Sequence, residues 1–166
     1  MKRLSALLAA FLVSCFGRPI DFPTPVDPVR IWVSDLTEAQ VPGLRESIQE
    51  SLDAWCQHRK LCGKLVAEGV PPYPTDWIVT YGGDAAGPSV VASTDYAKKR
   101  IYLFARQSDG DVIRFVELGQ CEHGPTRDVE LRTVVAHELG HAFGLHHVED
   151  KRDIMRPATR CDGLLP

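Results

Sequence analysis

The segment from His137 to His147, HELGHAFGLHH, carries the residues best suited to chemistry. On a helix, residues four apart lie on one face, about one turn apart, so His137 and His141 can point at the same metal ion. Gly144 suits a helix C-terminus and would let the chain turn back, so that His147 supplies a third nitrogen. Three imidazoles leave one position of a tetrahedral site open for water, as in a catalytic zinc site.

Glu138 stands next to the first of these histidines and supplies the remaining group that hydrolysis needs. A zinc ion held by imidazoles lowers the pKa of a water molecule toward ~7 and polarises a carbonyl group. Glu138 is placed to take a proton from that water and pass it to the leaving amine. We therefore expect a zinc-dependent endopeptidase with Glu138 as general base and acid. The alternative is a surface helix end with a chance cluster of histidines, which the fixed offsets of the glycine and the third histidine disfavour.

The extended pattern H-E-x-x-H-x-x-G-x-x-H resembles the signature of the metzincin metalloproteases, which carry a methionine turn downstream. Here Asp153-Ile154-Met155-Arg156-Pro157 follows shortly after His147. The short gap and the Met-x-Pro ending look most like the matrixins, the family of the matrix metalloproteinases. The resemblance implies that Met155 forms a hydrophobic floor beneath the zinc site and is not a ligand. The alternative, an ordinary methionine of the core, is physically almost the same role. It also favours His147 over His146, which spacing alone leaves open.

The same resemblance carries expectations for the rest of the domain. It implies one catalytic zinc ion, protein or peptide substrates, and an antiparallel edge strand at Ser89–Ser93 that pairs with extended substrate. Residues after Met155 would line the pocket for the side chain that follows the scissile bond.

Several features of the sequence depart from the family pattern. Arg156 stands where matrixins usually have Tyr, no cysteine-switch propeptide is present, and nothing matches the loop for structural zinc and calcium, so calcium is unsupported. The chain ends at Pro166, and we expect the C-terminal helix to be missing.

Hydrophobic patterns predict an α/β (α+β) domain in which one twisted mixed sheet carries two helices. The first helix follows a cap at Asp35 or Thr37 and should bury the stripe Val41, Leu44, Ile48, Leu52 and Trp55. The second helix runs from Val129, after a possible cap at Thr126, and stops near Gly144. The segment 105–127 reads as a long surface connection. The expected strands are Val29–Val33, Leu65–Ala67, Trp77–Tyr81, Ser89–Ser93 and Arg100–Phe104.

The N-terminus is typical of an export signal. Lys2 and Arg3 precede the apolar run 4–13, which is too short to span a membrane but has the length of a signal-peptide core. Its end, Leu12-Val13-Ser14-Cys15, resembles the lipobox of bacterial lipoproteins. This resemblance implies lipidation of Cys15 and attachment to the cell envelope, either in the periplasm at the outer membrane or on the cell surface. Simple secretion, or a short buried helix, are the alternatives. We divide the chain into a signal at 1–15, a proline-rich tether at 16–28 and a catalytic domain at 29–166.

The cysteines agree with an oxidising compartment. Removing Cys15 leaves an even number, which suits disulfides in an exported protein. We favour Cys56–Cys62, which are near neighbours, and Cys121–Cys161, which flank the zinc motif. Free buried thiols remain the alternative.

Other features narrow the function further. The net charge is -3 and no basic stripe is present, so nucleic acid is not an expected partner; we expect a monomer. His58 and His123 are not at ligand spacing and are expected at the surface or in loops. Asp84, Asp109 and Asp111 are expected in solvated turns, because they lack the regular spacing of a calcium loop.

Two other functions compete with an active envelope endopeptidase: a zinc-binding surface lipoprotein without catalysis, and a secreted effector protease. Glu138 argues against the first, because a binding site needs no general base.

Overall fold

A mixed five-stranded sheet forms the centre of the molecule. The computed structural model describes residues 28–87, 90–108, 110–117, 127–150 and 152–156. The strand order is β2-β1-β3-β5-β4, and every neighbouring pair is parallel except β4 with β5, which is antiparallel. The strands are β1 (Val29–Val33), β2 (Gly63–Leu65), β3 (Trp77–Tyr81), β4 (Ala92–Asp95) and β5 (Arg100–Leu103).

Most of this sheet matches the prediction, with shifts at three strands. β1 and β3 have the predicted bounds, β2 begins two residues early, and β5 ends one residue early. β4 was predicted at Ser89–Ser93 but spans Ala92–Asp95, because it pairs with β5 from Ala92 opposite Leu103 to Asp95 opposite Arg100. It is the antiparallel edge strand that the family resemblance implied.

Two further strands correct the prediction of a surface connection over 105–127. β6 (Ile113–Val116) and β7 (Arg127–Glu130) form a separate parallel pair. Ile113 is buried, and Arg114 of β6 makes two hydrogen bonds, of 2.8 and 2.7 Å, to the carboxylate of Asp128. The side chain of Asp128 is only 1% exposed, so the guanidinium balances a charge that burial would otherwise destabilise. β6 pairs with a strand that begins 14 residues later in the sequence, and no local sequence pattern predicts the pairing.

The predicted first helix is two helices. α1 (Asp35–Gln40) is capped by Ser34, whose Oγ accepts a hydrogen bond from the Thr37 amide at 3.0 Å, and not by Asp35 or Thr37. Pro42 and Gly43 interrupt the helix, and Gly43 has φ of 82° at the N-cap of α2 (Leu44–Arg59). Pro42 offers no amide hydrogen, and a positive φ favours glycine, so the chain restarts here.

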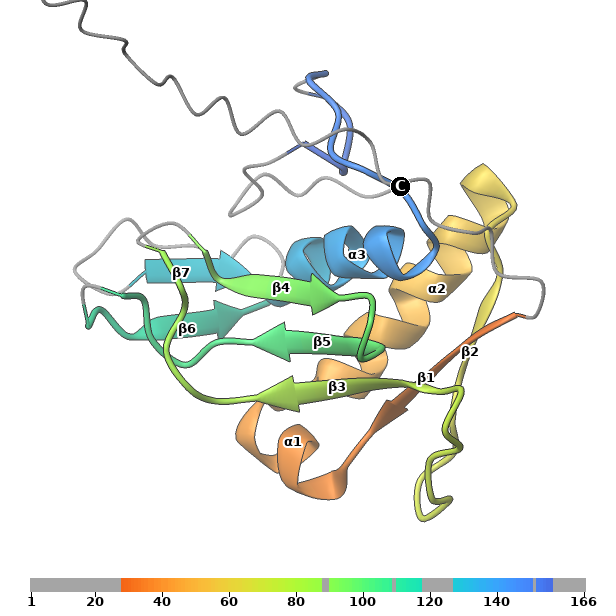
Figure 1. The fold of residues 1–166 in the computed structure, drawn as a ribbon, viewed down its shortest axis with the longest axis horizontal. Coiled ribbons are helices and arrows are strands. Elements are labelled where there is room, and N and C mark those ends of the chain that lie inside the picture. Colours follow the sequence, from red (N-terminus) through yellow and green to blue (C-terminus); the bar gives the residue numbers. More distant parts are fainter. Residues whose placement is uncertain (1–27, 88–89, 109, 118–126, 151, 157–166) are drawn as a thin grey trace, which may run out of the picture.

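The buried stripe of α2 was predicted correctly and faces α3 (Leu131–Ala142). Leu44, Ile48, Leu52 and Trp55 are all at most 1% exposed. Figure 1 shows α2 and α3 on the same side of the sheet, with β4 next to α3. The indole nitrogen of Trp55 donates a hydrogen bond of 2.8 Å to the carbonyl of Ala136, so the two helices are joined by a polar contact as well as by packing.

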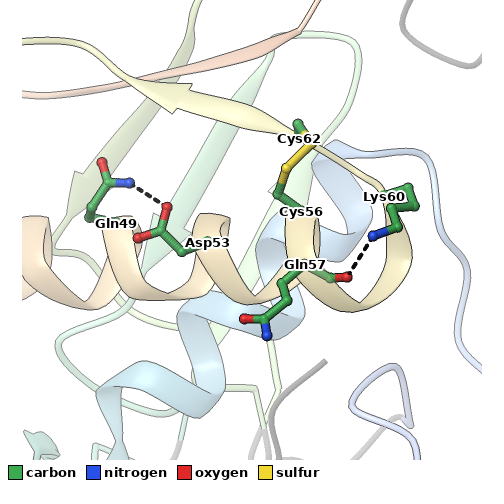
Figure 2. Close-up of a disulfide and its surroundings, with 6 residues drawn as sticks. All are labelled: Gln49, Asp53, Cys56, Gln57, Lys60 and Cys62. Atoms are coloured by element: carbon green, nitrogen blue, oxygen red, sulfur yellow. Dashed lines mark hydrogen bonds between the residues drawn. A yellow bond between two sulfur atoms is a disulfide. The ribbon is translucent and has the colours of Figure 1, made fainter.

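A disulfide joins Cys56 near the end of α2 to Cys62, as predicted (Figure 2). It ties the helix end to the turn that leads into β2, and Lys60 within that turn has a positive φ of 60°. The other predicted pair, Cys121 with Cys161, lies outside the described residues, as do Cys15 and the segments 1–15 and 16–27. Among the helices of the described part, none combines the length and apolar character needed to cross a membrane.

Candidate metal centre

Helix α3 positions the first two histidines of the motif. It begins at Leu131, two residues later than predicted, because Val129 belongs to β7 and Glu130 is the N-cap; Thr126 lies outside the described residues. His137 and Glu138 are buried in a helix that is enclosed by α2 and β4. Both side chains are therefore held against neighbouring elements and not in open solvent.

The helix ends as predicted, so that a third histidine can return to it. α3 stops at Ala142, and Gly144 follows with φ of 89°. This left-handed conformation favours glycine and turns the chain out of the helix. The amide of Gly144 donates to the carbonyl of His141 at 2.8 Å, and the chain then runs back to His147.

Three imidazole nitrogens converge beyond this turn. The Nε2 atom of His147 lies 3.1 Å from Nε2 of His137 and 3.1 Å from Nε2 of His141. The three side chains form a group that could hold a metal ion, with ligand atoms within 4.8 Å of one another. Tetrahedral bonds of ~2.0–2.1 Å to zinc would separate two nitrogens by about 3.3 Å, which is close to the observed spacing.

The hydrogen bonds made by the Nδ1 atoms indicate that the converging Nε2 atoms face one another with their lone pairs. Nδ1 of His137 lies 2.7 Å from the carbonyl oxygen of Ile154, and Nδ1 of His141 lies 2.8 Å from that of Leu145. A carbonyl oxygen only accepts, so each Nδ1 carries the hydrogen and the neutral ring has none on Nε2. His147 Nε2 could donate to only one of them. The other lone pairs repel one another at this distance. A cation shared by the three nitrogens would remove that repulsion, so the three imidazoles fit a metal ion.

The electrostatics favour the neutral imidazoles that metal binding requires. Burial lowers the pKa of His141 to about 4, although its hydrogen bond to Leu145 opposes the change. Burial also lowers the pKa values of His137 and His147 below their usual value. At each ring this desolvation disfavours the charged imidazolium, and so favours the neutral form that binds metal.

Met155 packs against α3 at Gly140, between the first two histidines in the sequence. It is 2% exposed. A Cβ atom at position 140 would overlap the Met155 sulfur and come within 3.0 Å of Cζ2 of Trp55. Only glycine therefore allows Met155 to approach the helix between the two histidines.

The segment before Met155 is held in place by hydrogen bonds. The Met155 amide donates to the carboxylate of Asp153 at 2.8 Å, and that carboxylate also accepts from Arg59 of α2 at 2.9 Å. Val148, next to the third histidine, donates to the Met155 carbonyl at 3.0 Å. These contacts fix the Ile154 carbonyl that orients the ring of His137, and such outer partners set the orientation and basicity of metal-binding histidines.

Glu138 lies on the same helix and has one partner that the sequence did not reveal. Its carboxylate Oε2 accepts a hydrogen bond of 2.6 Å from Oγ1 of Thr94 on β4. Burial raises the pKa of Glu138 to about 7, although this hydrogen bond lowers it. A carboxyl group with a pKa near 7 can exchange protons at neutral pH. Thr94 was missed because it is 44 residues away in sequence and directly follows the predicted strand Ser89–Ser93.

The remaining candidates do not join the site. His146 is exposed and is not in the converging group, and His58 is exposed on α2, as expected. Asp84 and Asp111 belong to no such group among the residues that the structure describes, and Asp109 and His123 are not described.

The sequence matches the family model for matrixins over residues 36–163. This range covers both long helices, the histidine motif and Met155. No curated protein matches the sequence significantly.

Proposed function

The chain belongs to the matrixin family of metallopeptidases, and we propose that it is a zinc-dependent endopeptidase with Glu138 as its general base. The observation that carries the proposal is the convergence of three imidazole Nε2 atoms next to a buried glutamate on the same helix. A site that only stores metal needs no proton acceptor beside its ligands, whereas hydrolysis does.

In this proposal His137, His141 and His147 hold the zinc ion. When bound, zinc acts as a Lewis acid toward a carbonyl group and makes water more acidic. The Glu138 carboxylate takes the proton from the attacking water and later gives it to the nitrogen of the leaving amine. Ile154 and Leu145 keep two of the imidazoles in the required tautomer through their carbonyl groups.

The edge strand β4 supports a protein or peptide substrate. It pairs with β5 on one side and ends the strand order of the described sheet. It also lies next to α3, which carries Glu138. An extended peptide can add to such an edge through backbone hydrogen bonds, and this would bring its carbonyl groups past the site.

We further propose that the domain is exported, with residues 1–15 as signal and Cys15 as the lipidated residue. The disulfide between Cys56 and Cys62 supports an oxidising compartment. Labelling of the expressed protein with palmitate, compared with a Cys15→Ala variant, tests lipidation; label that persists in the variant contradicts it.

Hydrolysis of a quenched fluorescent peptide library, with zinc quantified, tests the proposed activity. We expect the wild type to cleave, a chelator to stop cleavage, and Glu138→Ala to keep zinc while losing at least about 100-fold in kcat/KM, since general base catalysis contributes about 10²–10⁴-fold. Glu46→Ala removes an exposed glutamate of α2 and serves as the matched control. Zinc binding by a wild type that cleaves nothing contradicts the proposal and favours a metal-binding protein.

A further inference from the structure

We propose that Thr94 is a positioning residue for Glu138, and that its hydroxyl group holds one carboxylate oxygen while the other handles the proton. This inference rests on the proposed function. Thr94 lies on β4, opposite Ile101 of β5, and Ile101 is buried. Its Oγ1 atom is 2.6 Å from Oε2 of Glu138 and 3.3 Å from the Glu138 carbonyl.

The shorter contact decides where the hydroxyl hydrogen goes. A threonine hydroxyl has a single hydrogen to donate, and an ionised carboxylate is a stronger acceptor than a carbonyl group that already serves the helix. Oγ1 therefore donates to Oε2. In this proposal the second carboxylate oxygen, Oε1, is the one that takes and returns the proton.

The position of Thr94 on a strand makes it suitable for this role. Backbone hydrogen bonds along β4 and β5 fix the threonine Cα, and β-branching restricts its χ1 angle. The Glu138 carboxylate is thus held by a residue of β4 and not only by its own helix α3. A glutamate without this contact would sample other side-chain rotamers, and small displacements of a catalytic group cost much of its rate.

Steady-state kinetics of Thr94→Val and Thr94→Ser test the proposal. Valine keeps the shape and removes the hydroxyl, whereas serine keeps the hydroxyl. We expect Thr94→Val to lower kcat by about 10–100-fold, since a misplacement of about 1 Å can cost about 10²-fold, with KM and zinc content unchanged. Thr94→Ser should recover most of kcat. Thr80→Val removes another strand hydroxyl, which donates to a backbone carbonyl at 3.4 Å, and should behave as wild type.

Three results would overturn the proposal. These are a kcat of Thr94→Val within about twofold of wild type, a Thr94→Ser variant as slow as Thr94→Val, and loss of zinc or of folded protein in Thr94→Val with both retained in Thr94→Ser. The last result would mean that the hydroxyl stabilises the fold and not the carboxylate.

A structural measurement separates this inference from the proposed function. If the wild type cleaves no peptide, the proposed function fails, and crystal structures of wild type and Thr94→Val still test the contact. We expect one position of the Glu138 side chain in wild type and a shifted or divided one in the variant. An unchanged side chain would contradict the positioning role.

Discussion

Gly140→Ala is the substitution whose effect on the site follows most directly from the structure. Gly140 lies on α3 between the first two histidines and has no open space beside it. An added Cβ would overlap the sulfur of Met155 and lie 3.0 Å from Cζ2 of Trp55. In an open helix, by contrast, alanine is more stable than glycine by about 1 kcal/mol.

The overlap outweighs the gain in helix propensity. Overpacking a core costs about 1–3 kcal/mol. The Met155 side chain can adjust because methionine is flexible, but Trp55 is 0% exposed and its indole is bonded to the Ala136 carbonyl. The cost should therefore lie in the upper part of that range, about 2–3 kcal/mol. After the propensity gain of about 1 kcal/mol, a net loss of about 1–2 kcal/mol remains, which lowers Tm by roughly 2–8 °C.

The same change should weaken metal binding. A displaced Met155 moves the adjoining Ile154 carbonyl, which holds the ring of His137. Loss of such an outer contact lowers metal affinity by about 10–100-fold. Thermal unfolding followed by circular dichroism and competitive zinc titration measure both effects.

A double mutant provides the control. Met155→Ala leaves a cavity and should cost about 2–5 kcal/mol by itself, but it also removes the sulfur that the Cβ added by Gly140→Ala would meet. The double variant should therefore be less destabilised than the sum of the two single changes. Unchanged Tm and zinc affinity in Gly140→Ala, or strictly additive effects, would refute the packing argument.

Two further predictions concern stability away from the metal centre. Replacing both Cys56 and Cys62 by Ser should lower the free energy of unfolding by about 2 kcal/mol, the loop-closure value for their separation of 6 residues; equal urea midpoints would contradict this. Burial by itself would raise the pKa of Asp76, but hydrogen bonds from Arg30 and the Tyr73 amide lower it below its usual value. The carboxylate therefore stabilises the fold above the unfolded pKa of ~3.9, and this stability is lost as pH falls through the lower folded pKa. The advantage of wild type over Asp76→Asn in urea unfolding should shrink as the pH falls from about 6 to about 3; an advantage independent of pH would contradict it.

The parts of the site that could be predicted from the sequence are those set by local geometry. His137 and His141 share a helix face because of their spacing, and Gly144 ends the helix because a left-handed conformation favours glycine. The pairing of Cys56 with Cys62 is likewise short in range. These predictions needed no knowledge of the remaining fold.

The parts that could not be predicted depend on contacts between distant segments. The pairing of β6 with β7 and the hydrogen bond from Thr94 to Glu138 join residues that no local pattern relates. The break between α1 and α2 is different, since Pro42 and Gly43 were visible. The stripe from Val41 onward continues across the break with Val41 buried, so its periodicity concealed the turn.

The zinc content of His147→Ala compared with His146→Ala tests the central claim most directly. The two histidines are neighbours in sequence and both exposed, but only His147 converges on His137 and His141. We expect purified His146→Ala to retain one zinc ion per chain and His147→Ala to lose it on dialysis. Retention of zinc by His147→Ala, or its loss from His146→Ala alone, would contradict the assigned metal site.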